Sequence, residues 1–432
     1  MVFARKRYLD QLTASIGNGM IKVITGPRRS GKSYLLFTIF RDWLLRSGVQ
    51  DDHILSLKLD QQSNARYRDL DEFVSFFKAQ RKADGNPTYF LIDEIQLVAP
   101  KENPWVKGQF LTFYDALNEF LGWENIEVFV TGINSHMLSS DIATEFRGRD
   151  WQIPMYPLSY SEIREQTDSS INDFSLWDLY WKYGGLPACV LESDESKKQK
   201  YLKQIYSTTY LKDIVEWYHL RDDVILENLV AYLASSVGSV LNPTNISNTF
   251  KSKLHMIVAP ATIRRYITYL NDAFVISEAQ RFDLKGKAII NGSSKYFFND
   301  MGLRNAAAHF LGQDQESHFM ENVIYNELVL RGFMVQVGSI TSTENVKGKP
   351  TKVTREVDFV ATKNGRKFYI QSVFLIDNPA KLQQEKESFR KIDDSFTRVI
   401  ISKFTSGASY DEDGVLRLGL FDFLLNKSNI ID

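Results

Sequence analysis

The chain has 432 residues, a length that predicts about two to four domains, and its 44% apolar and 24% charged residues are typical of a soluble globular protein. A formal net charge of −1 excludes a global basic field for nucleic-acid binding, and the single cysteine, Cys189, excludes an internal disulfide and a cysteine-based metal cluster. The sequence contains no apolar run of about 18 residues, so no membrane span is predicted. The N-terminus lacks the apolar segment of a signal peptide. We therefore expect a cytoplasmic protein without a membrane partner.

The first strong pattern follows a predicted short amphipathic helix within residues 1–19. Residues 26–33 read Gly-x-x-x-x-Gly-Lys-Ser between an apolar strand and an apolar helix pattern. The loop's N–H groups and the helix N-terminus would hold a phosphate, with Lys32 on the β- and γ-phosphates and Ser33 on Mg²⁺. The pattern favours nucleoside triphosphate binding over an ordinary strand-to-helix turn that contains glycine. The candidate nucleotide-binding residues are Gly26, Pro27, Arg28, Arg29, Ser30, Gly31, Lys32, Ser33 and Tyr34.

Two acidic residues end a later buried strand. After a second strand over 53–59 and a helix, residues 88–96 read as a short apolar strand closing on Asp93 and Glu94. Asp93 would bind Mg²⁺ beside Ser33, and Glu94 would act as a general base on the water that attacks the γ-phosphate. The alternative is a solvated turn, but the distance from the phosphate loop favours catalysis.

Polar residues also end the fourth predicted strand and precede the fifth. Asn134, or Ser135, is placed to touch the γ-phosphate or the attacking water, and the alternative is a turn residue. Arg147 and Arg149 come just before a strand over 151–155. One of them could act as an arginine finger on the nucleotide of a neighbouring subunit, although a surface arginine remains the alternative.

The middle of the chain is predicted to be mostly helical. The pattern is helical from 158 to about 190, and the charged segment 192–198 is a plausible boundary. Further on, two short helices near 242–250 and 259–270 and a β-wing over 280–290 outline a winged helix. Winged helices bind DNA or serve only in protein packing, so DNA contact stays open. The candidate recognition-helix residues are Thr262, Arg264, Arg265 and Tyr269.

The last part combines a helix over 318–333 with strands over 355–361 and 365–374. Period-two alternation predicts Glu356 and Asp358 on one face of the first strand, with Val357 and Phe359 on the other. An acid on the helix and polar residues on both strands could converge on Mg²⁺ for phosphodiester hydrolysis, or they could be exposed polar residues. The candidate metal ligands are Glu321, Asp358 and Gln371.

Several segments resemble a known family. GPRRSGKS, LIDEIQ, VTGINSHML, RGRDWQIPMYPLSYSEI and WKYGGLPACV resemble bacterial and archaeal AAA-type P-loop ATPases of the STAND/AAA-related group. KYFFNDMGLRN, ENVIYNELVLRGF and REVDFV resemble that family's C-terminal domain of unknown function, which is similar to the restriction-endonuclease-like PD-(D/E)XK fold.

The resemblance implies ATP as the nucleotide, Mg²⁺ as cofactor and a homo-oligomeric AAA+-type ring. It matches Asn134 to sensor 1 and places Arg149 in a G-R motif before the fifth strand. Glu321 and Asp358 match the first two acidic positions of the nuclease-like fold. The third motif departs from the (D/E/Q)-x-K pattern, because Gln371 is followed by Ser-Val and the lysine is missing, which disfavours nuclease activity.

We therefore predict an α/β fold in four parts. A P-loop AAA+-type core with a parallel sheet covers 1–157, a helical lid and linker 158–198, a helical winged-helix domain 199–290, and a PD-(D/E)XK-like α/β domain 291–432. The predicted function is Mg²⁺-dependent ATP hydrolysis coupled to conformational change in a protein that acts on DNA. The alternatives are an ATP-gated protein-binding switch and an ATP-dependent nuclease.

Overall fold

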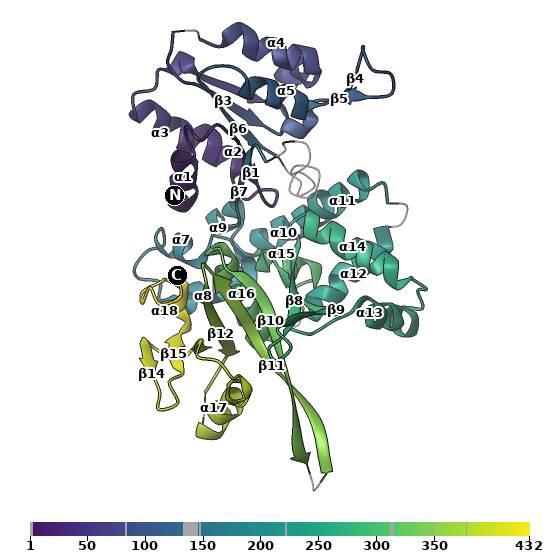
Figure 1. Ribbon diagram of the computed structural model, residues 1–432, viewed down its shortest axis with the longest axis vertical. Helices are drawn as coiled ribbons and strands as arrows, with labels where there is room; N and C mark the ends of the chain where they lie inside the picture. The colour runs from purple at the N-terminus through teal and green to yellow at the C-terminus, as the bar shows by residue number, and fades with distance from the viewer. Residues whose placement is uncertain are drawn as a thin grey trace. The chain divides into compact units, whose positions relative to one another are not determined.

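Figure 1 shows the computed structural model, which describes residues 3–82, 84–132, 146, 148–220, 223–311, 315–346, 349–376 and 378–432. The chain forms two compact units. Unit 1 comprises Met1–Pro157 and Asp272–Phe274, and unit 2 comprises Leu158–Asn271 and Val275–Asp432. Within the described ranges, no helix combines the length and the apolar character needed to cross a bilayer.

Unit 1 is built on a parallel five-stranded sheet of order β2-β3-β6-β1-β7, which confirms the predicted sheet. β1 and β3 are buried along their whole length, as strands covered on both faces are in parallel sheets, whereas the edge strand β7 is largely exposed. The strands are β1 (Ile21–Thr25), β2 (Ile54–Lys58), β3 (Thr88–Asp93), β6 (Ile126–Thr131) and β7 (Asp150–Pro154), with a small hairpin of β4 (Lys101–Glu102) and β5 (Phe110–Leu111). The helices are α1 (Lys6–Ala14), α2 (Lys32–Tyr34), η1 (Leu35–Phe40), α3 (Arg41–Arg46), α4 (Leu70–Gln80) and α5 (Phe113–Leu121).

Aromatic side chains fill one face of this sheet. Phe77 of α4 and Phe120 of α5 pack on Phe90 of β3, and Phe73 of α4 packs on Phe77 and Phe120. All four are fully buried. On α2, η1 and α3, which run on as one continuous helix, Phe40 contacts Phe129 of β6 with ring centroids 4.6 Å apart. Burial on this scale fixes the helix that begins at Lys32 against the sheet.

Unit 2 contains a mixed eight-stranded sheet of order β14-β15-β13-β12-β11-β10-β8-β9. Its strands are β8 (Ile276–Asp283), β9 (Ala288–Phe298), β10 (Met334–Val346), β11 (Lys349–Lys363), β12 (Arg366–Val373), β13 (Thr397–Ser402), β14 (Ala408–Tyr410) and β15 (Leu416–Gly419). Its helices are α7 (Tyr160–Arg164), α8 (Asp173–Tyr183), α9 (Pro187–Leu191), α10 (Glu195–Ile205), η6 (Tyr206–Leu211), α11 (Lys212–Trp217), α12 (Asp223–Ser235), α13 (Pro243–Thr249), η7 (Phe250–Leu254), α14 (Pro260–Asp272), α15 (Met301–Ala307), α16 (Glu316–Leu330), α17 (Pro379–Lys386) and α18 (Leu420–Leu424).

The β8–β9 hairpin follows α13 and α14, at the position of the predicted wing. It is not a separate hairpin, because β8 pairs in parallel with β10 over Val337–Ser339. The predicted winged-helix segment and the C-terminal strands therefore share one sheet, and β9 runs across residue 290. The division of unit 2 into lid, winged helix and C-terminal domain stays a prediction.

The β10–β11 pair forms a long ribbon that is visible as the green hairpin in Figure 1. Its register shifts between Gln336, which pairs with Val360, and Gly338, which pairs with Val357. β11 therefore has one more residue than β10 between these two pairs, as in a β-bulge. The predicted alternation is therefore wrong here. Val357 packs in a core cluster with Val360, whereas the ring of Phe359 contacts those of Phe297 and Tyr325.

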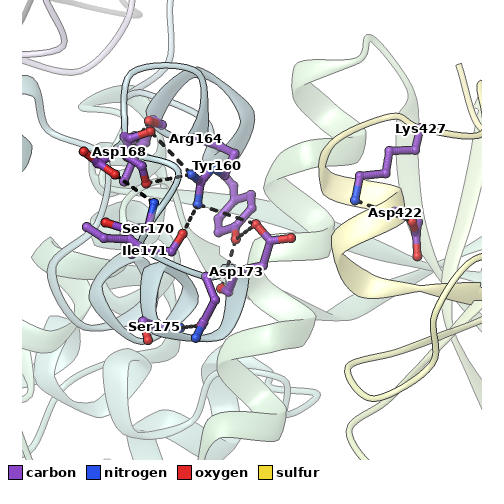
Figure 2. A network of polar contacts seen from close by, with 12 residues as sticks. Tyr160, Arg164, Asp168, Ser170, Ile171, Asp173, Ser175, Asp422 and Lys427 are labelled. Atoms are coloured by element: carbon purple, nitrogen blue, oxygen red, sulfur yellow. Dashed lines mark hydrogen bonds and ion pairs between the residues drawn. The ribbon is translucent and has the colours of Figure 1, made fainter.

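The segment predicted as one helical stretch from 158 to about 190 consists of three helices, α7, α8 and α9. Figure 2 shows the polar network that joins α7 to α8. The Tyr160 hydroxyl donates to the backbone oxygen of Asp173 at 3.0 Å, and Arg164 donates to the backbone oxygens of Ile171 and, at 3.0 Å, Asp168. These bonds satisfy backbone carbonyls where the helical pattern is interrupted.

Candidate functional site

The loop between β1 and the helix starting at Lys32 approaches β7 very closely. Gly26 has φ +133°, and a Cβ at this position would lie 2.0 Å from the backbone oxygen of Met155. Gly31, with φ 99°, precedes the helix and turns the chain into it. The two glycines of the motif therefore meet two requirements, close approach and a positive φ.

Lys32 is buried against this loop. Its Nζ donates to the backbone oxygens of Gly26 at 2.9 Å and Pro27 at 2.8 Å. Burial lowers the pKa of Lys32 to about 8, although the charges of Glu94 and Asp93 act in the opposite direction. The ammonium is thus held at the mouth of the loop by carbonyl oxygens rather than by a carboxylate.

Ser33, in the first turn of the helix at Lys32, meets Asp93 at the carboxyl end of β3. The Ser33 hydroxyl donates to Asp93 Oδ1 at 3.0 Å, and the Thr131 hydroxyl from the end of β6 donates to the same oxygen. Asp93 is 3% exposed. The ends of β3 and β6 and the first turn of the helix at Lys32 thus place two hydroxyls around one buried carboxylate.

Glu94 follows Asp93 in a left-handed backbone conformation, with φ 56°. Its N–H donates to Thr131 Oγ1 at 3.2 Å, and its carboxylate accepts a hydrogen bond from the Gln96 side-chain amide. Burial raises the pKa of Glu94, an effect that the Gln96 hydrogen bond partly offsets and the charge of Asp93 reinforces. A carboxylate with a raised pKa in an unusual backbone conformation is typical of a proton acceptor in an active site.

The residues present fit a magnesium-bound nucleoside triphosphate. The first N–H groups of the helix at Lys32 have no acceptor within the helix and form an anion site. The buried Ser30 hydroxyl has no hydrogen-bond partner among the described residues and lies in the same loop. Ser33 and Asp93 would hold the metal through oxygen ligands, which Mg²⁺ prefers.

The other predicted nucleotide-binding residues of unit 1 differ in burial. Pro27 is buried, Arg28 is half-buried, and Arg29 and Tyr34 are exposed. Asn134, Ser135 and Arg147 lie outside the described residues.

Arg149 lies near the amino ends of β1 and β7, whereas the phosphate loop follows the carboxyl end of β1. Its backbone oxygen accepts from Ile21 N–H at 2.9 Å, beside the amino end of β1, and its side chain is exposed. Because β7 and β1 are parallel, Arg149 is remote from Lys32 of its own chain. A role in the site of a neighbouring subunit stays a prediction.

In unit 2, the predicted acidic residues Glu321 and Asp358 meet a lysine that the sequence pattern did not single out. Lys295 Nζ lies 2.7 Å from Glu321 Oε1, 2.5 Å from Glu356 Oε1 and 3.9 Å from Asp358 Oδ1. Burial alone would lower the pKa of Lys295, but the charges of the three carboxylates raise it above its usual value. Burial and the charge of Glu321 raise the pKa of Asp358 to about 8.

Gln371 lies beside this cluster, but its amide oxygen is engaged. Gln371 Oε1 accepts from Asp358 N–H at 2.8 Å, and Asp358 Oδ2 accepts from Ser372 N–H at 2.8 Å. Among the described residues, no group of three or more His, Cys, Asp or Glu is arranged to hold a metal ion. A neighbouring cavity of about 630 Å³ is lined by Arg355, Glu356, Gln371, Ala380, Gln383, Gln384, Glu387 and Ser388.

Sequence reasoning missed Thr131, Gln96 and Lys295. Thr131 had a usable signal, since it ends a strand whose carboxyl edge carries the ligand in doubly wound sheets. Gln96 lies two residues after Glu94, within reach of its carboxylate. Lys295 had no comparable signal, because its partners are distant in the sequence. The nearest of them, Glu321, is 26 positions away.

Comparisons with known proteins agree with this description. A family described as an AAA domain matches residues 18–164, and a domain of unknown function (DUF8612) matches residues 174–316. An uncharacterized protein of Methanocaldococcus jannaschii is 28% identical over 331 residues, which cover 73% of this chain and 67% of that one. AMPPCP-bound DnaA from Aquifex aeolicus superposes with a TM-score of 0.32 at 15% identity, covering 63% of this chain and 89% of that one, a likeness too low to carry an argument on function.

An uncharacterized protein of Haemophilus influenzae is 32% identical over 431 residues, which cover 98% of this chain and 99% of that one. An AAA domain is a P-loop nucleotide-binding domain, and the match includes Lys32, Ser33 and Asp93. The chain therefore belongs to the same family as the Haemophilus influenzae protein, with an AAA domain over residues 18–164.

Proposed function

We propose that this protein is a Mg²⁺-dependent ATPase that couples ATP binding and hydrolysis to a conformational change in a protein acting on DNA. The observation that carries the proposal is the cluster of Lys32, Ser33, Asp93 and Glu94 at one edge of the parallel sheet. Each of these side chains is positioned by a different backbone or side-chain contact of unit 1.

The roles of the residues follow from their surroundings. Lys32 would exchange its two carbonyl acceptors for phosphate oxygens, and Ser33 with Asp93 would orient the metal. Bound Mg²⁺ would neutralise charge on the β- and γ-phosphate oxygens. Glu94, held by Thr131 and Gln96, would accept the proton of the attacking water.

Nucleotide affinity should depend on pH through Lys32. Its free-protein pKa of about 8 lies below the usual value because of burial, and a bound triphosphate would raise it again. Below pH 8 Lys32 is already protonated, so the affinity is flat. Above pH 8 binding must take up a proton, and the affinity should fall by up to about tenfold per pH unit. Calorimetric titration with ATP between pH 7 and 9.5, in buffers of different ionisation enthalpy, measures both the affinity and the proton uptake.

Lys32→Arg is the control for this titration, because arginine stays protonated over the whole range. The variant should bind ATP with a flat pH profile. A flat profile in the wild-type protein, or an equal fall in both proteins, would show that Lys32 is not the titrating group.

Two surfaces support DNA as the partner. Arg264 and Arg265 are exposed on α14, just before the β8–β9 hairpin, and Lys349 and Lys352 are exposed on the β10–β11 ribbon. Cations on an exposed helix and ribbon are suited to phosphate contacts. Tyr269, also predicted on the recognition helix, is instead engaged in packing, with its ring centroid 3.5 Å from that of Tyr218.

Steady-state ATP turnover with and without duplex, single-stranded and branched DNA tests the proposal, with Glu94→Gln as the blank. Stimulation by one DNA form, reduced in an Arg264→Ala/Arg265→Ala variant, would support a DNA-coupled ATPase and identify its substrate. Turnover that is lost in the blank but indifferent to every DNA would favour the protein-binding switch. A wild-type protein that turns over no more ATP than the blank would overturn the proposed ATPase.

A further inference from the structure

A buried lysine lies at the centre of the carboxylate cluster of unit 2. Lys295 of β9 is 2% exposed, and its Nζ is within 2.7 Å of Glu321 on α16 and 2.5 Å of Glu356 on β11. A third carboxylate, that of Asp358, lies 3.9 Å away. The ammonium therefore occupies the position between carboxylates of two different elements.

A divalent cation shared by these carboxylates would need the same position. Mg²⁺ and Ca²⁺ bind carboxylate oxygens at roughly 2.0–2.6 Å, so an ion shared by Glu321 and Glu356 would meet the Lys295 ammonium. The oxygens it would bind already accept hydrogen bonds, and the ammonium charge would repel it. Lysine and metal are thus alternatives at this site.

Two further oxygens of the cluster also accept hydrogen bonds from the backbone. Asp358 Oδ2 accepts from Ser372 N–H, and Gln371 Oε1 accepts from Asp358 N–H, each at 2.8 Å. Access is open, because Glu356 and Gln371 also line the cavity of about 630 Å³ beside α17. Charge and occupied ligands, rather than a closed path, therefore keep an ion out.

We propose that the Lys295 ammonium is the resident cation of this cluster and takes the place of a divalent metal. The lysine then ties β9, α16 and β11 together through Glu321, Glu356 and Asp358 as an ion-paired core. The cluster holds no hydrolytic metal, so unit 2 does not cleave phosphodiesters through it. This inference goes beyond the proposed ATPase and does not depend on nucleotide.

The test is Mn²⁺ binding to the full-length, nucleotide-free protein, followed by electron paramagnetic resonance and by thermal unfolding. Lys295→Met removes the charge and keeps the length of the side chain. It should bind Mn²⁺ at least about tenfold more tightly than the wild-type protein, and Mn²⁺ should raise its Tm. Lys295→Arg keeps the charge and should show neither effect. Adding Asp358→Asn to Lys295→Met should remove the new site.

Two results would overturn the proposal. One is a Mn²⁺ site in the wild-type protein that Asp358→Asn abolishes. The other is a folded Lys295→Met protein that gains no Mn²⁺ affinity. If Lys295→Met does not fold, the comparison of wild type with Asp358→Asn decides alone: a wild-type Tm indifferent to Mn²⁺ and to EDTA supports a metal-free cluster.

Discussion

Replacing Glu94 by glutamine is expected to lower ATP turnover by about 10²- to 10⁴-fold, the usual contribution of a general base. Glutamine has the same shape and can still accept the hydrogen bond from Gln96, but it cannot take a proton from water. ATP binding should be nearly unchanged, because Lys32 and Ser33 provide the phosphate and metal contacts. Turnover by phosphate release and affinity by calorimetry separate the two effects.

Glu124→Gln is the matched control for this variant. Glu124 is exposed in the turn before β6, in the same unit, and removing its charge should change neither turnover nor binding. If Glu94→Gln retained turnover close to the wild-type rate, another group would have to activate the water. Equal loss of binding and turnover would instead assign Glu94 a structural role in the site.

Replacing Gly26 by alanine is expected to produce the second large effect, a loss of stability in unit 1 together with a loss of nucleotide binding. The alanine Cβ would lie 2.0 Å from Met155 O, so β7 or the loop must move. Strain at the positive φ costs about 1–2 kcal/mol, and overpacking adds roughly 1–3 kcal/mol. Urea unfolding and ATP titration measure the two losses.

Gly48→Ala separates strain from collision. Gly48 has φ +92°, but a Cβ there meets nothing within 4 Å, so this variant should show the conformational cost alone and bind ATP normally. The difference between the two free energies of unfolding then reports the contact with Met155. Equal losses in both variants would mean that β7 does not constrain the loop.

The phosphate loop could be predicted from sequence because its chemistry is local. Gly26, Lys32 and Ser33 lie within eight residues, and their strand and helix are evident from apolar spacing. Thr131 differs, since its contact with Asp93 depends on β6 lying next to β3, which spacing along the chain does not reveal. The acidic pair Asp93 and Glu94 was placed correctly at a strand end, but the left-handed conformation of Glu94 was not predictable.

In unit 2, the sequence located the polar residues but not their partners. Glu321 and Asp358 come together as expected, yet the cation between them is a lysine from β9, brought there by the order of strands in a mixed sheet. The alternation rule failed on β11 because a bulge adds one residue between Val357 and Val360. The remote position of Arg149 could have been deduced, because a residue before a parallel strand lies at the edge opposite the phosphate loop.

The position of β1 in the sheet also governs how the nucleotide site is assembled during synthesis. β1 is the fourth strand in the order β2-β3-β6-β1-β7, and its two neighbours come about a hundred or more residues later in the chain. Contacts between such distant segments form slowly, because the entropy of closing a long loop is lost before the contacts contribute favourable free energy. We therefore expect the phosphate loop to lack its neighbouring strands until β7, which ends at Pro154, has left the ribosome, while most of the chain is still to be made.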